Sequence, residues 1–229
     1  MNNKMACEMR NPMRIGITGG IAAGKSTVVA HMRELGAFVL DYDGIAAEVV
    51  APDTPGLRKI VSAFGPEAID NQGQLRRKWL SSVIFGGAEH APLRERLNAI
   101  VHPLVYERAA ILETRFMQRL DNGIDSRSRI IIHDIPLLTE VIRTIPFDFR
   151  HIITVEAPVD LRIQRMLSSR HMSMDDAQAR IQSQSNEHQR LDIADIVIDS
   201  AVSIEQMFET VDRVYAGLVQ EQQRSCDAR

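Results

Sequence analysis

The sequence predicts an α/β fold in which a doubly wound parallel sheet of five strands is flanked by helices. The four later strand-like segments are short apolar runs without alternation, which indicates burial on both faces of a parallel sheet. All five runs alternate along the chain with stretches of helical periodicity, as in doubly wound folds. The expected strands are residues 14–18, 37–40, 129–133, 152–155 and 196–198.

The helical stretches between these strands differ greatly in length. The stretch between the second and third strands is too long for a simple crossover, so we expect a helical, substrate-binding insertion over about residues 54–118. A segment rich in Arg and Gln follows the fourth strand, with a polar interruption around 168–173 that is typical of a lid tip. The remaining expected helices are residues 25–35, which Gly36 ends, and residues 203–219.

The composition is that of an ordinary globular protein. The chain has 229 residues, 45% of them hydrophobic and 25% charged, which suits one domain or one domain with insertions. A net charge of −3 gives no basic field, so nucleic acid is not an expected partner. No apolar run reaches the roughly 18 residues of a membrane helix. Cys7 and Cys226 form no disulfide framework or metal cluster, which fits a reducing cytoplasm.

Both ends of the chain are expected to lie outside the folded domain. Residues 1–12 lack the apolar core of a signal peptide and read as a disordered extension, whereas Met13 opens the first strand. Residues 220–229 read as a solvated C-terminal tail. The expected domain is therefore residues 13–219.

The first strand runs into a glycine-rich loop with the spacing of a phosphate-binding P-loop. The pattern is Gly19-x-x-x-x-Gly24-Lys25-Ser26, and it lies between a strand and a helix, as its mechanism requires. Backbone N–H groups of such a loop curl around phosphate oxygens at the helix N-terminus. Lys25 is expected to reach the β- and γ-phosphates and Ser26 to bind Mg²⁺. The dinucleotide pattern G-x-G-x-x-G is absent, which argues against a Rossmann oxidoreductase.

Aspartates follow the second and third strands at the edge where the loop also lies. Asp43 has the position of a carboxylate that accepts the proton of a hydroxyl acceptor, although capping of the next helix is the alternative. Asp134 resembles a Walker B aspartate, which holds Mg²⁺. The preceding His133 is expected to be a buried core histidine rather than a catalytic one.

Four arginines recur along the lid segment. Arginine on a mobile lid can neutralise the charge that develops during phosphoryl transfer, while the alternative is a solvated basic face. These residues are Arg162, Arg165, Arg170 and Arg180.

With these residues in place, the chain closely resembles the dephospho-coenzyme A kinase family, collinearly over about residues 14–219. The resemblance rests on the following segments: ITGGIAAGKST, LGAFVLDYDGIAAEVV, GQLRRKWLSSVIF, LNAIVHP, HDIPLLTE, RMLSSRHMSMDDAQARIQSQ and ADIVID. The D-x-D-x-I-A and D-I-P-L-L patterns together are much more specific than the P-loop. The family implies a five-stranded parallel core of the P-loop nucleoside triphosphate hydrolase type, a helical substrate domain and a lid over about residues 160–190.

The resemblance also implies an activity and a set of roles. The family transfers the γ-phosphoryl group of ATP to the ribose 3′-hydroxyl of dephospho-CoA with Mg²⁺. The resemblance implies that Asp43 is the base and that Lys25 and the lid residue Arg165 are also catalytic. It further implies that Asp134 lies near the substrate and the metal. Substrate-domain roles carry over loosely to Arg77 and His102. The implied ATP-binding residues are Gly20, Ile21, Ala22, Ala23, Gly24, Lys25, Ser26, Thr27 and Arg170. We expect a cytoplasmic monomer or weak homo-oligomer that binds no membrane.

Three positions depart from the family pattern. Ala22-Ala23 stands where the family usually has Gly-Ser, so Ala22 must have a negative φ or be strained, and we expect binding to survive. Thr139 replaces a usual Phe, which alters packing beside the acceptor. Asp199-Ser-Ala-Val replaces an Asp-Asn-x-Gly turn where adenine is expected to bind, which leaves the adenine contacts open.

Two other function classes remain as alternatives. Another small-molecule P-loop kinase, acting on a nucleoside or nucleoside monophosphate, shares the loop but not the D-x-D-x-I-A and D-I-P-L-L pair. A non-catalytic nucleotide switch is disfavoured because the guanine-reading motif N-K-x-D is absent.

Overall fold

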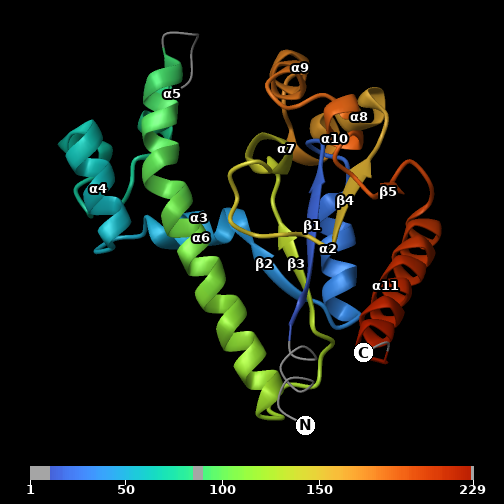
Figure 1. The fold of residues 1–229 in the computed structure, drawn as a ribbon. Coiled ribbons are helices and arrows are strands. Elements are labelled where there is room, and N and C mark those ends of the chain that lie inside the picture. Colours follow the sequence, from blue (N-terminus) through green and yellow to red (C-terminus); the bar gives the residue numbers. More distant parts are fainter. Residues whose placement is uncertain (1–10, 85–89, 228–229) are drawn as a thin grey trace. The chain divides into compact units, whose positions relative to one another are not determined.

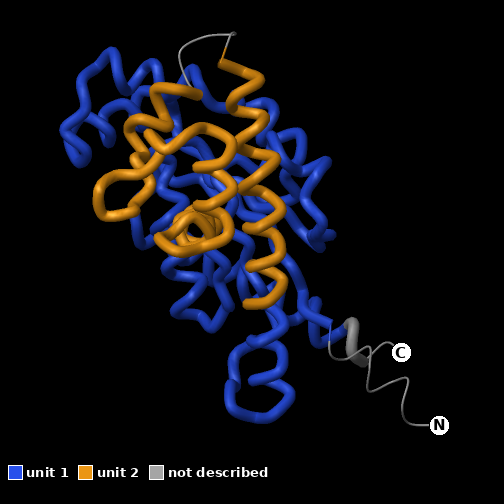
Figure 2. Tube along the Cα trace, turned by 90° about the vertical axis from the view of Figure 1, so that its left-hand side faces the viewer, with its two compact units in different colours: residues 1–41, 113–229 blue, residues 42–112 orange. Residues whose placement is uncertain are grey.

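The computed structural model describes residues 11–84 and 90–227. The predicted disordered extension therefore lies almost wholly outside the described residues, as does Cys7. The chain divides into two compact units, one of residues 1–41 with 113–229 and the other of residues 42–112 (Figure 2). Among the described residues, no helix combines the length and the apolar character that crossing a membrane requires.

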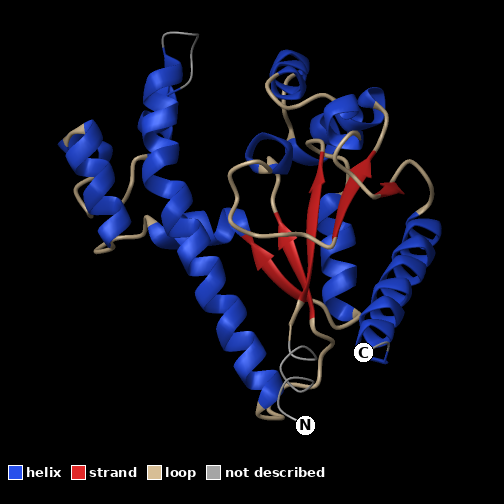
Figure 3. Cartoon of the chain, viewed as in Figure 1, coloured by secondary structure: helices blue, strands red, loops and turns tan. Residues whose placement is uncertain are grey.

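The first unit contains a five-stranded sheet, drawn in red in Figure 3, in which every pairing is parallel. The spatial order is β2-β3-β1-β4-β5, so β1 is central and its neighbours come from later in the chain. The strands are β1 (Met13–Gly19), β2 (Phe38–Asp41), β3 (Ile130–Asp134), β4 (His151–Glu156) and β5 (Ile196–Asp199). The predicted fold class is confirmed, and each predicted strand lies within one or two residues of its observed bounds.

Two helices cover one face of this sheet, α2 (Lys25–Glu34) and α11 (Ile204–Asp227), and they pack against each other (Figure 1). Apolar side chains from this face of the sheet and from both helices form one buried cluster. Fully buried members include Ile15, Val28, Ile132, Ile153 and Val211.

The opposite face of β1 and β3 packs against side chains from the segment that follows β3. A Cβ atom on Gly16 would lie 2.9 Å from a Leu138 side-chain carbon and 3.4 Å from the Phe149 ring, so the backbone approaches these side chains closely. His133 is fully buried here, with its ring 4.9 Å from that of Phe147 and 5.2 Å from that of Phe149. The prediction of a core histidine is confirmed.

The segments after β3 and β4 form short helices near the carboxyl ends of the strands (Figure 1). They are α7 (Leu138–Val141), α8 (Val159–Arg170), α9 (Met174–Gln182) and α10 (Glu187–Leu191). The predicted interruption is confirmed, because His171, in the left-handed region at φ 51°, ends α8 and Ser173 caps α9. The sequence analysis missed α7 and α10, which are too short to show a clear period. A capping box between Asn186 and Gln189 specifies α10.

The prediction of a solvated tail over residues 220–229 is wrong for most of that segment. Helix α11 continues to Asp227 instead of ending at residue 219. Glu221 accepts hydrogen bonds from Arg150 (2.5 Å) and His151 (2.7 Å), and these contacts tie the helix end to the start of β4. The charged sequence is therefore a paired helix surface rather than a frayed end.

The second unit is helical and has its own core. Its elements are α3 (Tyr42–Val49), α4 (Pro55–Phe64), the 3₁₀ turn η1 (Pro66–Ala68), α5 (Arg77–Ile84) and the first part of α6 (Ala91–Asp121). The start of helix α4 is stabilised by two residues that favour helix N-termini, because Thr54 caps the helix and Pro55 occupies its first turn. The core consists of Val50, Ile60, Ala68, Leu80 and Ile84.

Candidate active site

The sheet brings two chemically distinctive strand ends to one edge. In the strand registers, Asp134 of β3 lies opposite Asp41 of β2 and Ile17 of β1. The glycine-rich loop leaves β1 two residues beyond Ile17, at the same edge. Crevices at the carboxyl ends of parallel strands are the usual ligand sites of such folds. The predicted convergence of the loop and Asp134 is therefore confirmed.

The loop turns tightly because two of its glycines sit where a side chain is not tolerated. A Cβ atom on Gly19 would approach the Val155 carbonyl oxygen to 2.6 Å. Gly24 has φ 92° at the N-terminus of α2, a conformation that glycine adopts without strain. The sequence spacing therefore encodes the backbone path.

The free backbone donors of the loop form a group at the N-terminus of α2. Within the described part of the chain, no hydrogen-bond acceptor faces the N–H groups of Ala22, Gly24, Lys25 and Ser26. Such a set of N–H groups at a helix N-terminus binds phosphate, because the donors and the helix dipole both favour an anion.

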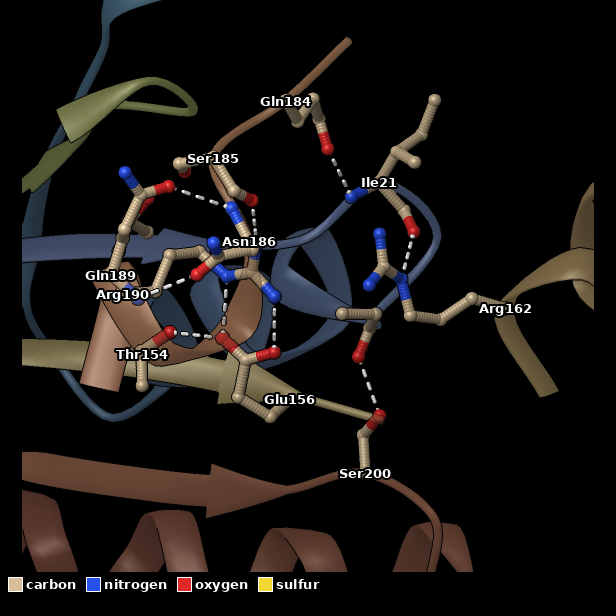
Figure 4. A network of polar contacts seen from close by, with 12 residues as sticks. Ile21, Thr154, Glu156, Arg162, Gln184, Ser185, Asn186, Gln189, Arg190 and Ser200 are labelled. Carbon is tan, nitrogen blue, oxygen red and sulfur yellow. Dashed lines mark hydrogen bonds and ion pairs between the residues drawn. The ribbon is translucent and has the colours of Figure 1, made fainter. Parts of the chain in front are cut away.

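The carbonyl oxygens of the same loop are held by side chains from elsewhere in the first unit (Figure 4). Arg162 Nε donates to the Ile21 carbonyl at 2.8 Å, and Arg165 Nη1 donates to that of Ala22 at 3.2 Å. The Ser200 hydroxyl donates to the carbonyl of Ala23 at 2.5 Å. With its carbonyls bonded on the outside, the loop keeps its free N–H groups available to a ligand.

Ala22, the residue that departs from the family pattern, adopts the strained alternative. Its φ is 60°, in the left-handed region. A non-glycine residue pays about 1–2 kcal/mol there, because Cβ crowds the following carbonyl oxygen. The loop therefore keeps the backbone shape that glycine would give, at a cost in strain.

Lys25 pairs with Asp134, and this contact joins the loop to the end of β3. Lys25 Nζ donates to Asp134 Oδ1, and both side chains are largely buried, at 15% and 12% exposure. In this arrangement the lysine charge is neutralised by the carboxylate. The two residues predicted to contact phosphate and metal are thus brought together.

Arg162 and Arg165 do not form the solvated basic face that was the alternative prediction. Arg162 is 3% exposed, and burial, followed by the charge of Arg190, lowers the pKa of its guanidinium. Arg165 donates through Nη1 and Nη2 to Ser200 as well as to the loop. Arg170 and Arg180, in contrast, are exposed, and neither side chain has a partner among the described residues. A solvated face therefore describes only the outer two arginines.

The sequence did not predict a buried ion pair between the end of the lid segment and β4. Arg190 of α10 is 2% exposed and donates to both carboxylate oxygens of Glu156, at 2.7 and 2.6 Å. Thr154 donates to the same carboxylate at 2.6 Å (Figure 4). A bidentate arginine–carboxylate contact is geometrically specific, so it fixes α10 at the end of β4.

A pocket of about 280 Å³ adjoins the loop at the end of β5. Its lining combines loop residues with apolar side chains after the strand and consists of Gly24, Thr27, Arg165, Ser200, Val202, Ile204 and Met207. The altered turn after Asp199 is part of this lining, and the Asp199 carboxylate stabilises it by accepting from the Ala201 N–H at 2.7 Å. Ser200 was missed as a site residue, although the departure at this turn was the available signal.

The remaining predicted site residues belong to the second unit. Asp43 is exposed and lies in the first turn of α3, inside the helix rather than before it, so it is not the helix cap. Arg77 is exposed at the start of α5. His102 lies within α6, where burial lowers its pKa and its ring centre lies 5.9 Å from that of Tyr106.

Thr139, the second departure from the family pattern, lies in α7. Its hydroxyl oxygen is buried and has no hydrogen-bond partner among the described residues. A buried hydroxyl without a partner costs free energy that the usual Phe would not.

Two oxygen donors suit a magnesium ion. Mg²⁺ prefers carboxylate, hydroxyl, water and phosphate oxygens, and protein sites commonly contribute only one or two of these ligands. The Asp134 carboxylate and the exposed Ser26 hydroxyl provide this kind of donor, and within the described residues the Ser26 hydroxyl makes no hydrogen bond. No cluster of three or more His, Cys, Asp or Glu side chains occurs in residues 11–84 and 90–227, so a metal here relies on water and phosphate for its other ligands.

The parallel sheet, the loop with free N–H groups, and the lysine and aspartate at its edge together define a P-loop nucleotide-binding protein. Comparisons with known proteins narrow this class. The family model described as dephospho-CoA kinase matches residues 13–206. The dephospho-CoA kinase of Bifidobacterium longum is 49% identical over 91% of this chain and 98% of its own length, and that of Streptomyces avermitilis is 40% identical over 90% and 94%. The chain belongs to the dephospho-CoA kinase family.

Solved structures share this fold, and one of the two described here is named as a dephospho-CoA kinase. The crystal structure of TT1252 from Thermus thermophilus has a TM-score of 0.70 and 29% identity, covering 91% of this chain and 98% of that one. Dephospho-CoA kinase from Campylobacter jejuni has a TM-score of 0.55 and 25% identity over the same shares. The family predicted from the sequence motifs is therefore confirmed.

Proposed function

We propose that this chain transfers the γ-phosphoryl group of ATP to the ribose 3′-hydroxyl of dephospho-CoA, giving CoA and ADP in the last step of CoA biosynthesis. Family membership supports the substrate pair. The observation that carries the chemistry is the loop, whose free N–H groups at the start of α2 lie beside the Lys25–Asp134 pair. In the reaction, the hydroxyl oxygen bonds to the γ-phosphorus and the bond to the β–γ bridging oxygen breaks.

The donor half of this proposal uses residues of the first unit. The loop from Gly20 to Thr27 holds the ATP phosphates, with Lys25 leaving Asp134 to contact the β- and γ-phosphates. The pocket beside Gly24 and Ser200 takes the adenine, since it is partly apolar and continuous with the loop. Arg165, already held against this pocket, and Arg170 at the end of α8 balance the charge of the transferring group.

The acceptor half uses residues of the second unit. Asp43 orients the ribose hydroxyl and accepts its proton. Its exposure and lack of a protein partner among the described residues leave the carboxylate available to a substrate. Arg77 and His102 bind other parts of dephospho-CoA, and the insertion that carries them is the substrate-binding part of the chain.

Magnesium is the cofactor in this proposal, with Ser26 and Asp134 as its protein ligands. The ion neutralises phosphate charge when bound with ATP. We further propose that the protein acts in the cytoplasm as a monomer or weak homo-oligomer and binds neither nucleic acid nor membrane, in keeping with its net charge of −3.

An acceptor panel tests the proposal. ADP release is measured with ATP, Mg²⁺ and one candidate acceptor at a time: dephospho-CoA, nucleosides and nucleoside monophosphates. We expect turnover with dephospho-CoA alone. Turnover only with a nucleoside or a nucleoside monophosphate would assign another small-molecule kinase, and nucleotide binding without transfer to any acceptor would assign a switch.

A further inference from the structure

The strained residue in the phosphate loop follows Ile21, whose backbone N–H and carbonyl groups are both hydrogen-bonded to side chains. The Ile21 carbonyl accepts from Arg162, and the Ile21 N–H donates to Gln184 Oε1 at 2.8 Å (Figure 4). Both side chains come from the segment after β4, more than 140 residues along the chain. The next residue, Ala22, has φ 60°. A left-handed alanine persists only where the surrounding structure determines the backbone.

Gln184 is itself held in position. Its neighbour Ser185 accepts a hydrogen bond at its carbonyl from Arg190, whose guanidinium is also bound to buried Glu156. The capping box that begins at Asn186 then fixes the start of α10. The segment that carries Gln184 is therefore anchored to the sheet, although Gln184 lies between two helices.

The arginine on the other side of Ile21 is equally constrained. Arg162 is 3% exposed, and its guanidinium lies so close to Gly20 that a Cβ atom there would approach its Cζ to 2.5 Å. The two contacts hold two successive peptides. Gln184 holds the Gly20–Ile21 peptide, and Arg162 holds the Ile21–Ala22 peptide, which carries the Ala22 N–H. With the peptides on both sides of Ile21 held, the direction in which the Ala22 N–H points is fixed. A loop with a relaxed Ala22 would point this donor elsewhere.

We propose that Gln184 is a positioning residue for ATP binding, which holds the phosphate loop in its binding shape by accepting from the Ile21 N–H. The need for this contact arises from Ala22. With glycine at position 22 the left-handed conformation carries no penalty, so the loop would keep its shape without Gln184. The inference rests on the proposed role of the loop as the ATP site.

A double-mutant cycle tests this coupling, with ADP as the probe in titration calorimetry on the full-length protein. Gln184→Ala should weaken ADP binding about tenfold, since this loss corresponds to roughly one hydrogen bond. In the Ala22→Gly background, the same Gln184→Ala change should weaken it by about threefold or less. Gln182→Ala is the matched control, because Gln182 is exposed at the end of α9 and should leave ADP binding unchanged.

Each outcome decides the proposal. Equal losses in the two backgrounds would overturn it and assign Gln184 a direct contact with the nucleotide. Unchanged affinity in the single variant would also overturn it, as would a loss that the Gln182→Ala control shares. The titration needs no acceptor, so a wild-type protein that binds ADP but does not phosphorylate dephospho-CoA would refute the proposed function and leave this inference standing.

Discussion

The two units differ in how they hold several of their proposed site residues. In the first unit, Lys25, Arg162 and Arg165 are bound by protein partners that hold them in place before any ligand arrives. In the second unit, Asp43 and Arg77 are exposed side chains without hydrogen-bond partners among the described residues. Much of the proposed donor site is thus organised by the fold, whereas these two proposed acceptor residues depend on the substrate to fix them. Substitutions in the first unit should therefore affect stability and nucleotide binding, and those in the second should affect turnover.

The largest expected effect tests how far the first unit depends on its buried ion pair. Arg190→Met leaves the Glu156 carboxylate buried without its partner, which should cost about 3–5 kcal/mol in the free energy of unfolding. Urea unfolding measures this change. Arg213→Met, at an exposed site on α11, is the control and should stay within about 0.5 kcal/mol. A small loss at Arg190 would mean that Thr154 and solvent satisfy Glu156 without it.

The second expected effect concerns the phosphate contact itself. Lys25→Ala removes the cation proposed to stabilise the transferring group, so kcat/KM should fall on the order of 10³-fold. Nucleotide binding should weaken as well, because the lysine contacts ground-state phosphates. The coupled ADP-release assay and ADP titration measure the two quantities. A variant that remains active would mean that the loop has been misinterpreted.

The third expected effect concerns the second unit and is tested with Asp43→Asn. The amide cannot accept the hydroxyl proton, so kcat should fall by about 10²-fold or more. ADP affinity and the free energy of unfolding should stay near the wild-type values, because Asp43 is exposed and lies outside the donor unit. A near-normal kcat would show that Asp43 does not act in catalysis. Weakened ADP binding would contradict the expectation that substitutions in the second unit affect turnover alone.

The smallest expected effect, when taken per pH unit, is a pH dependence of stability in the first unit. Burial lowers the pKa of His133 to about 3, below its ordinary value of 6.5. The unfolded chain therefore binds the proton more readily between these values, and stability falls as pH drops from 6.5 toward 3. One such group contributes at most about 1.4 kcal/mol per pH unit. Urea midpoints across this range should depend less steeply on pH in His133→Gln, while exposed His188→Gln should change the slope little. Identical slopes in wild type and His133→Gln would contradict the assignment.

Local signals predicted much of this molecule. The five strands, the loop and Asp134 were found because burial on both faces and the glycine spacing leave marks within a few residues. The helix end at Asp227 was missed because pairing of Glu221 with Arg150 and His151 depends on distant residues. The same holds for Ser200, Gln184 and the Arg190–Glu156 pair. Their partners lie far away in the sequence, and only Ser200 had a local signal, which was the altered turn after Asp199.

The strain at Ala22 shows where a family comparison adds to local signals. The departure from Gly-Ser marked the position, but only the backbone shows that alanine takes the left-handed conformation rather than relaxing. The contacts that enforce this conformation come from the same unit as the loop. The sequence thus identified Ala22 as a position of possible backbone strain, and the fold shows that the strained conformation is adopted.

The central claim is that the donor held by the first unit phosphorylates one particular hydroxyl. NMR analysis of the purified product from wild-type protein, ATP, Mg²⁺ and dephospho-CoA tests it most directly. We expect a single new phosphate monoester at the ribose 3′ position, with one ADP formed for each. A phosphate at any other position, or ADP formed without a phosphorylated acceptor, would contradict it.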